Sequence, residues 1–183
     1  EITCGGSLSS LLEAAGGTSA PVQAFLVGGY SGTWFAAGLA PDLRLGHSGM
    51  RALDASLGAG VVIALPVGAC AVTETARIFR YLADESAGQC GPCVFGLDTI
   101  SETLADIAAG AARPSAAARI ERWGREISGR GACSHPDGAL RLVRSCLKVF
   151  GADVTRHLDG HPCATEPAMT ALLPLPAYYT AYV

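Results

Sequence analysis

In the first third of the chain, short apolar runs alternate with glycine-rich breaks, a pattern typical of small strands and short helices. Ser7 precedes a leucine-rich helical stretch that should end at Gly16-Gly17, because serine caps helix starts and glycine favours helix ends. Val22–Val27 and Val61–Leu65 are predicted strands, the first closed by two glycines and the second by a proline. Two strands with a small helix beside them predict an α+β module over residues 1–66.

After that module the apolar period becomes helical, with hydrophobic side chains recurring every three or four residues. The pattern predicts four amphipathic helices joined by short loops, which together form a four-helix bundle over residues 67–163. Residues 164–183, rich in proline and tyrosine, are expected to form an extended tail. The four apolar stripes comprise Val72, Ala76, Phe79 and Leu82; Cys93, Leu97, Ile100, Leu104 and Ile107; Ile120, Trp123 and Ile127; and Leu140, Val143, Leu147, Phe150 and Val154.

Composition and charge narrow the class of protein. Half of the 183 residues are apolar and 16% are charged, which is typical of a folded globular chain. A net charge of −3, without a dense run of Lys and Arg, argues against nucleic acid as a partner. The longest apolar stretch, Val61–Val72, is too short for a transmembrane helix and is interrupted by Pro66 and Gly68. Because no signal peptide is visible and the chain starts at Glu1, we expect a cytoplasmic protein with a further region upstream. A peripheral position on a membrane complex stays open.

The seven cysteines are the main candidates for chemistry. Their odd number and the lack of a secretory signal favour metal ligands or buried thiols over a disulfide framework. Cys90 and Cys93 flank a Gly-Pro turn that would aim both sulfurs at one metal, and Cys133 lies in a second glycine-rich loop. In an up-down bundle both loops come to the same end, so the three sulfurs should lie close together. Cys146 falls beside the fourth apolar stripe and is expected to be a core thiol.

Two other interpretations of the cysteine pair stay open at this point. Cys-Gly-Pro-Cys is also the redox motif of thioredoxin-like proteins, although it follows a strand there and a predicted helix here. Structural zinc needs four nitrogen or sulfur ligands, and His135 is the candidate fourth ligand beside the three cysteines.

The segment Glu85–Cys93, with the sequence ESAGQCGPC, and the later loop with Cys133 resemble the cluster-binding region of the NADH-binding flavoprotein subunit of respiratory complex I. Related subunits of NAD-reducing hydrogenases and formate dehydrogenases share this region. Gly28–Gly32 and Ala55–Ile63 are similar to the β-grasp module, or SLBB, that precedes it in the family. The resemblance implies a β-grasp module followed by a helical iron–sulfur domain. It also implies that FMN and NAD(H) bind on a domain upstream of Glu1.

The sequence departs from that family at Ala87, where the family pattern has its first cluster cysteine. The resemblance assigns Cys90, Cys93 and Cys133 as the other ligands, of a [3Fe-4S] cluster or of a [4Fe-4S] cluster with water or another residue on one iron. The implied function is electron transfer from the flavin to a redox partner, a ferredoxin-like protein or a complex I-like subunit, in a quinone- or ferredoxin-linked NADH oxidoreductase. No residue of this chain is assigned a catalytic role. The alternatives are a protein-binding module that has lost its cluster and a structural domain that is stabilised by a zinc ion.

Two smaller features complete the sequence picture. His157, His161 and Cys163 have the spacing of a second metal site, but they follow a predicted helix end, where we expect ordinary solvated histidines. Trp34 and Phe35 follow a glycine turn and could form an exposed binding patch or fill the core of the first module, and the core is the favoured interpretation.

Overall fold

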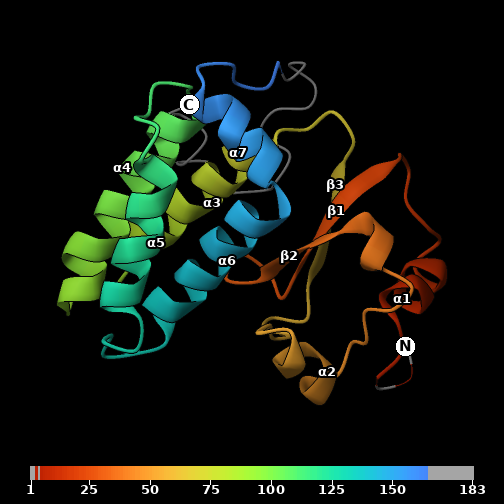
Figure 1. Cartoon of the computed structure of the whole chain (residues 1–183). Helices are drawn as coiled ribbons and strands as arrows, with labels where there is room; N and C mark the ends of the chain where they lie inside the picture. Colours follow the sequence, from red (N-terminus) through yellow and green to blue (C-terminus); the bar gives the residue numbers. More distant parts are fainter. Residues whose placement is uncertain (1–2, 4, 165–183) are drawn as a thin grey trace. The chain divides into compact units, whose positions relative to one another are not determined.

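The computed structural model describes residues 3 and 5–164 (Figure 1). The predicted tail from Ala164 therefore lies outside the described residues apart from its first residue, and so does Cys4. The chain divides into two compact units, Glu1–Val67 and Gly68–Val183. The first combines a small sheet with helices, whereas the second is helical in its described part, so the predicted α+β class is confirmed.

The first unit begins with the short helix that the sequence predicts. Helix α1 spans Leu8–Ala14, and the Oγ atom of Ser7 caps it by accepting a hydrogen bond from the Ser10 amide at 3.1 Å. The chain then turns at Gly16 and Gly17, whose φ angles of +88° and +85° lie in the left-handed region that glycine favours. The predicted serine cap and glycine stop are both confirmed.

A three-stranded antiparallel sheet follows, in the order β2-β1-β3. The two predicted strands are present, with β1 (Val22–Val27) at the centre and β3 (Val62–Pro66) at one edge. The sequence pattern does not predict β2 (Thr33–Ala36), because this strand has only four residues and directly follows a glycine-rich turn. That turn needs Gly32, since a Cβ atom there would lie 2.3 Å from the Val27 carbonyl oxygen.

The core of the first unit lies between the sheet and the short helices of the same unit. The 3-10 turn η1 (Ala37–Leu39) and helix α2 (His47–Ala52) are both too short for the hydrophobic pattern to predict. Trp34 and Phe35, both expected in the core, are 1% and 6% exposed. One cluster of buried apolar residues comprises Leu8, Phe25, Val27, Phe35, Ala40, Leu43, Leu45, Met50 and Ala55.

The second unit contains five α-helices and one π-helix within its described residues (Figure 1). Helix α3 packs against α4 and α6. Most residues of the predicted apolar stripes are buried, whereas Trp123, Ile127 and Leu147 are half-buried. Among the described residues, no helix is both long and apolar enough to cross a lipid bilayer. The elements are α3 (Ala71–Asp84), the π-helix η2 (Pro92–Leu97), α4 (Asp98–Ala108), α5 (Ala116–Ile127), α6 (His135–Val149) and α7 (Gly151–Leu158).

Two of the four predicted helices are divided in the structure. The second runs as a π-helix into α4, and the fourth is broken into α6 and α7 at Phe150, whose φ and ψ are −110° and 30°. The apolar stripe nevertheless continues across the break, because Leu140 and Val154 are both buried. Hydrophobic periodicity therefore locates the buried face of this segment correctly and does not reveal the change of helix direction at Phe150.

Candidate functional site

Cys90 and Cys93 lie where the loop after α3 turns into the π-helix η2. The amides of Cys93 and Val94 both donate to the Cys90 carbonyl at 3.0 Å, which closes a tight turn between the two cysteines. Pro92 begins the π-helix, a position where its lack of an amide hydrogen breaks no helical hydrogen bond. Cys93 is 4% exposed and Cys90 is half-buried, so the turn holds both thiols near the helical core.

The two thiols of this turn have different electrostatic environments. Hydrogen bonds from the backbone of Ala132 and of Cys93 lower the pKa of Cys90, because they favour its thiolate. Burial raises the pKa of Cys93, and the hydrogen bond with Cys90 and the nearby Cys133 raise it further, whereas the Ser86 hydroxyl lowers it. Both environments thus include groups of the second loop. The Ala132 backbone contacts Cys90, and Cys133 lies near enough to Cys93 to affect its pKa.

The loop that carries Cys133 joins α5 to α6 and is held by short-range contacts. Asp137 in the first turn of α6 pins the start of the loop, because its Oδ1 atom accepts from the Ser128 hydroxyl at 3.0 Å and from the Gly129 amide at 2.9 Å. Gly131 is required by close packing, since a Cβ atom there would lie 2.6 Å from the Cys133 carbonyl oxygen. These contacts fix the backbone on both sides of the exposed Cys133 thiol.

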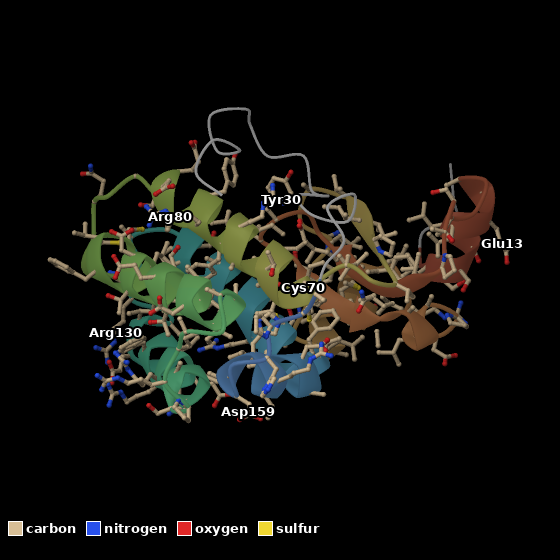
Figure 2. All side chains as sticks on the ribbon, turned by 90° about the horizontal axis from the view of Figure 1, so that it is seen from above. Glu13, Tyr30, Cys70, Arg80, Arg130 and Asp159 are labelled. Carbon is tan, nitrogen blue, oxygen red and sulfur yellow. The ribbon has the colours of Figure 1, made fainter. Side chains whose placement is uncertain are left out.

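A contact between helices holds the two loops at one end of the helical unit. The Nε2 atom of His135, the first residue of α6, donates to the carbonyl of Leu82 in the last turn of α3 at 2.7 Å. Arg130, labelled in Figure 2, belongs to the loop at this end. Because its Nε2 atom is engaged, His135 could offer a metal only its Nδ1 atom, which weakens its case as a fourth ligand.

Ala87 lies exposed in the first loop, three residues before Cys90. Its carbonyl accepts a hydrogen bond from the Gln89 side chain at 3.1 Å, but its methyl group has no lone pair to offer a metal. The three thiols and the backbone donors around Cys90 fit an iron–sulfur cluster with one iron that lacks a protein thiolate. The three sulfurs are not among the groups of metal-binding atoms in the described chain that lie within 4.8 Å of one another, so as they stand they are too far apart for one zinc ion.

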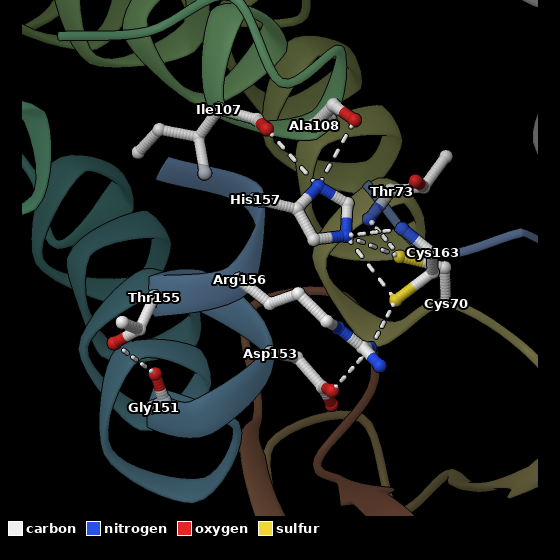
Figure 3. A network of polar contacts seen from close by, with 10 residues as sticks. All are labelled: Cys70, Thr73, Ile107, Ala108, Gly151, Asp153, Thr155, Arg156, His157 and Cys163. Carbon is white, nitrogen blue, oxygen red and sulfur yellow. Dashed lines mark hydrogen bonds and ion pairs between the residues drawn. The ribbon is translucent and has the colours of Figure 1, made fainter. Parts of the chain in front are cut away.

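A second group of sulfur and nitrogen atoms gathers elsewhere in the same unit. One sulfur each from Cys70 and Cys163 and a ring nitrogen of His157 lie within 4.8 Å of one another (Figure 3). The expectation of solvated histidines is wrong for His157, which is 0% exposed, and correct for His161, which is exposed. Sequence reasoning missed Cys70, because nothing local connects a cysteine before α3 with a histidine 87 residues later.

Burial dominates the environments of two further thiols. Burial raises the pKa of Cys146 to about 12, although a hydrogen bond with Thr75 opposes the rise. This agrees with the prediction that Cys146 is a thiol of the core. Burial also raises the pKa of Cys163 to about 11, a rise that the hydrogen bond with Cys70 increases and the Arg156 charge opposes. All six cysteines in the described part of the chain are free thiols.

Similarity to known proteins centres on the helical unit. Residues 73–157 match the family described as the NADH-ubiquinone oxidoreductase-F iron-sulfur binding region. The match extends from α3 to α7 and includes both cysteine loops, with Cys90, Cys93 and Cys133.

Curated relatives and a solved structure agree with this match. The F subunit of the NADH-quinone oxidoreductase of Streptomyces coelicolor is 30% identical over 127 residues, which cover 69% of this chain and 28% of that protein. The corresponding F 2 subunit of Rhizobium meliloti is 30% identical over 168 residues, or 89% of this chain and 39% of that protein. An NAD+-reducing [NiFe]-hydrogenase in the air-oxidized state matches with a TM-score of 0.75 and 26% identity, over 91% of this chain and 28% of that one.

This chain therefore spans well under half the length of each of these relatives. Within that span, the order of helices and cysteine loops is the one that the sequence resemblance implies. Residues 73–157, just under half of this chain, match the family of NADH-ubiquinone oxidoreductase-F iron–sulfur binding regions.

Proposed function

We propose that this chain is the iron–sulfur, electron-transferring part of an NADH-linked oxidoreductase flavoprotein subunit. The proposal is supported by the contact of the Ala132 backbone with Cys90 and the effect of Cys133 on the pKa of Cys93, inside the region matched to an iron–sulfur family. In this proposal residues 1–66 form an SLBB-like β-grasp module and residues 67–163 form the cluster-binding domain. Residues 164–183 are the tail that follows.

The electrons would come from an FMN that NADH reduces, with both molecules bound outside these 183 residues. They would leave to a redox partner, either ferredoxin-like or a complex I-like subunit. The cluster, when bound, takes up and releases one electron at a time. The chain's own groups hold it through the three thiolates and tune its potential through the backbone donors of Ala132 and Cys93. Such a role needs no acid, base or nucleophile.

The metal content of the chain, prepared without oxygen and reconstituted with ferrous iron and sulfide, tests this proposal. We expect a brown protein that contains iron together with acid-labile sulfide. The Cys93→Ala variant should lose most of the iron. The control variant Cys146→Ala removes a buried thiol that lies in α6, away from the two loops, and should keep its iron. A colourless protein that contains zinc and no sulfide would contradict the proposal, and so would iron loading that is unaffected by Cys93→Ala.

A further inference from the structure

Three residues from separate places in the helical unit point their metal-binding atoms at one another. Cys70 is the N-cap of α3, His157 lies in the last turn of α7, and Cys163 lies in the segment that follows α7. The His157 Nε2 atom lies 3.4 Å from the Cys70 sulfur and 3.2 Å from the Cys163 sulfur (Figure 3). Two sulfurs and one imidazole nitrogen therefore surround a common point.

The orientation of the His157 ring is fixed from the opposite side. Its Nδ1 atom lies 3.0 Å from the carbonyl oxygens of both Ile107 and Ala108, at the end of α4. Two acceptors at this atom require Nδ1 to carry the hydrogen, which leaves a lone pair on Nε2. That lone pair accepts from the Cys163 amide at 3.1 Å beside the two sulfurs, so a metal at Nε2 would replace this hydrogen bond. A backbone carbonyl on the distal nitrogen is the arrangement that orients histidine ligands in metal sites.

Both sulfurs also accept hydrogen bonds from positively polarised groups. The Thr73 amide at the start of α3 donates to the Cys70 sulfur at 3.4 Å, where the helix dipole also favours negative charge. The Arg156 guanidinium donates to the Cys163 sulfur at 2.9 Å and is held by Asp153 at 2.6 Å. These donors suit thiolates, the form in which cysteine binds a metal.

We propose that Cys70, His157 and Cys163 bind a zinc ion. Zinc–sulfur bonds of about 2.3 Å and zinc–nitrogen bonds of about 2.0 Å, at tetrahedral angles, would separate sulfur from nitrogen by about 3.5 Å. The observed separations of 3.4 and 3.2 Å are close to these values, and the main adjustment is at the Cys163 amide, which would have to turn away from Nε2. Two thiolates and one imidazole suit zinc better than calcium or magnesium, which prefer oxygen ligands. A solvent molecule takes the fourth position on the side of Cys163, which is only partly buried.

The zinc ion would connect segments of this unit and would not carry electrons, because zinc has no redox chemistry. With three protein ligands it would differ from the usual structural site, in which four protein ligands surround the ion. Cys70 precedes the first turn of α3, whereas the loop with Cys90 follows its last turn. A helix of 14 residues is about 21 Å long, so the two groups lie at opposite ends of α3. The ion would fasten the segment after α7 to the start of α3. This inference does not depend on the proposed electron transfer.

The test is the zinc content of the full chain, purified under a thiol reductant and without chelators, measured by elemental mass spectrometry. We expect one zinc ion per chain that stays bound after buffer exchange. Cys163→Ser and Cys70→Ser should weaken zinc binding by at least about a hundredfold, the upper range seen when groups that merely orient a ligand are removed. His161→Ala is the matched control, because this exposed histidine lies four residues after His157 and faces no sulfur of the group.

Cobalt provides a readout that reports geometry. Cobalt added to metal-free protein should give the intense visible bands of a tetrahedral site and thiolate charge-transfer bands in the near ultraviolet, both lost in Cys163→Ser. Iron loading in that variant shows that the helical unit still folds. Zinc that is lost with Cys93→Ala and kept with Cys163→Ser would place the ion at the other cysteines and overturn the proposal. A Cys70–Cys163 disulfide in reductant-purified protein, or no retained zinc, would overturn it equally.

Discussion

The two cysteine groups of the helical unit are built in opposite ways. Cys90, Cys93 and Cys133 come from two glycine-rich loops, and the Cys133 thiol is exposed. The other group is carried by helix ends and the segment after α7, with Cys70 2% exposed and His157 0% exposed. A loop site can adjust its geometry to a large inorganic group and lies within reach of a redox partner. A site of buried helix ends is preformed, which suits a small ion that holds elements together.

The electrostatics of the thiols follow the same division. Backbone hydrogen bonds lower the pKa of Cys90 in the loop site, because they favour its thiolate. Burial raises the pKa of Cys163 in the other site to about 11, so its thiolate needs a cation beside it near neutral pH. If both proposals hold, the first site would assemble a cofactor, whereas in the second a metal would complete a largely buried polar group.

Ala87→Cys should have the largest effect on the loop site, because it supplies a thiolate where the family has its first ligand. In the wild type, the iron without a protein thiolate should be lost in air, which leaves a [3Fe-4S] cluster with an electron spin resonance signal in its oxidised state. Ferrous iron under reducing conditions should restore the fourth iron. In Ala87→Cys, the four-iron cluster should persist in air.

Gln89→Cys is the matched control for that change, since it adds a thiol to the same exposed loop at a position the family does not use as a ligand. It should leave the cluster as labile as in the wild type. A wild-type cluster that is stable as [4Fe-4S] in air and unaffected by Ala87→Cys would instead show a substitute ligand, for which Ser86 and His135 are the candidates.

Removal of zinc should have the next largest effect, on the stability of the helical unit. An ion present at about a thousand times its dissociation constant stabilises the folded state by about 4 kcal/mol, because it binds only that state. A strong zinc chelator should lower the free energy of unfolding by about this amount, measured by denaturant titration under reductant. Cys163→Ser should show no chelator effect. A chelator effect of equal size in that variant would assign the stabilising ion to another site.

Gly131→Ala should disturb the loop site and spare the other. A Cβ atom there would lie 2.6 Å from the backbone oxygen of Cys133, so the loop must shift, at a cost of about 1–3 kcal/mol. Iron per chain should fall, and zinc per chain should not. Gly151→Ala is the control, because its Cβ atom would meet nothing within 4 Å. Equal iron loading in both variants would show that the Cys133 loop tolerates displacement.

The contrast between the two sites also explains what sequence reasoning could reach. The loop cysteines are visible as a motif, because a turn places Cys90 and Cys93 side by side and bundle topology returns Cys133 to the same end. Cys70 and His157 meet only through the packing of α3, α4 and α7, which no local spacing encodes. The same limit applies to the fold. Periodicity predicts β1, β3 and the long helices, whereas β2 and α2 are too short to leave a pattern.

Asp137→Ala should give the smallest of these effects, again confined to the loop site. The Asp137 carboxylate accepts from the Ser128 hydroxyl and the Gly129 amide, and it lies in the first turn of α6, where negative charge favours the helix. Its loss should cost about 1 kcal/mol, because the contacts are exposed to solvent. Hydrogen exchange at the Gly129 amide should accelerate with it. Asp137→Asn keeps an acceptor oxygen and should recover most of the amide protection, although not the charge. If Asp137→Ala leaves exchange at Gly129 unchanged, the loop is held by packing around Gly131 and not by this carboxylate.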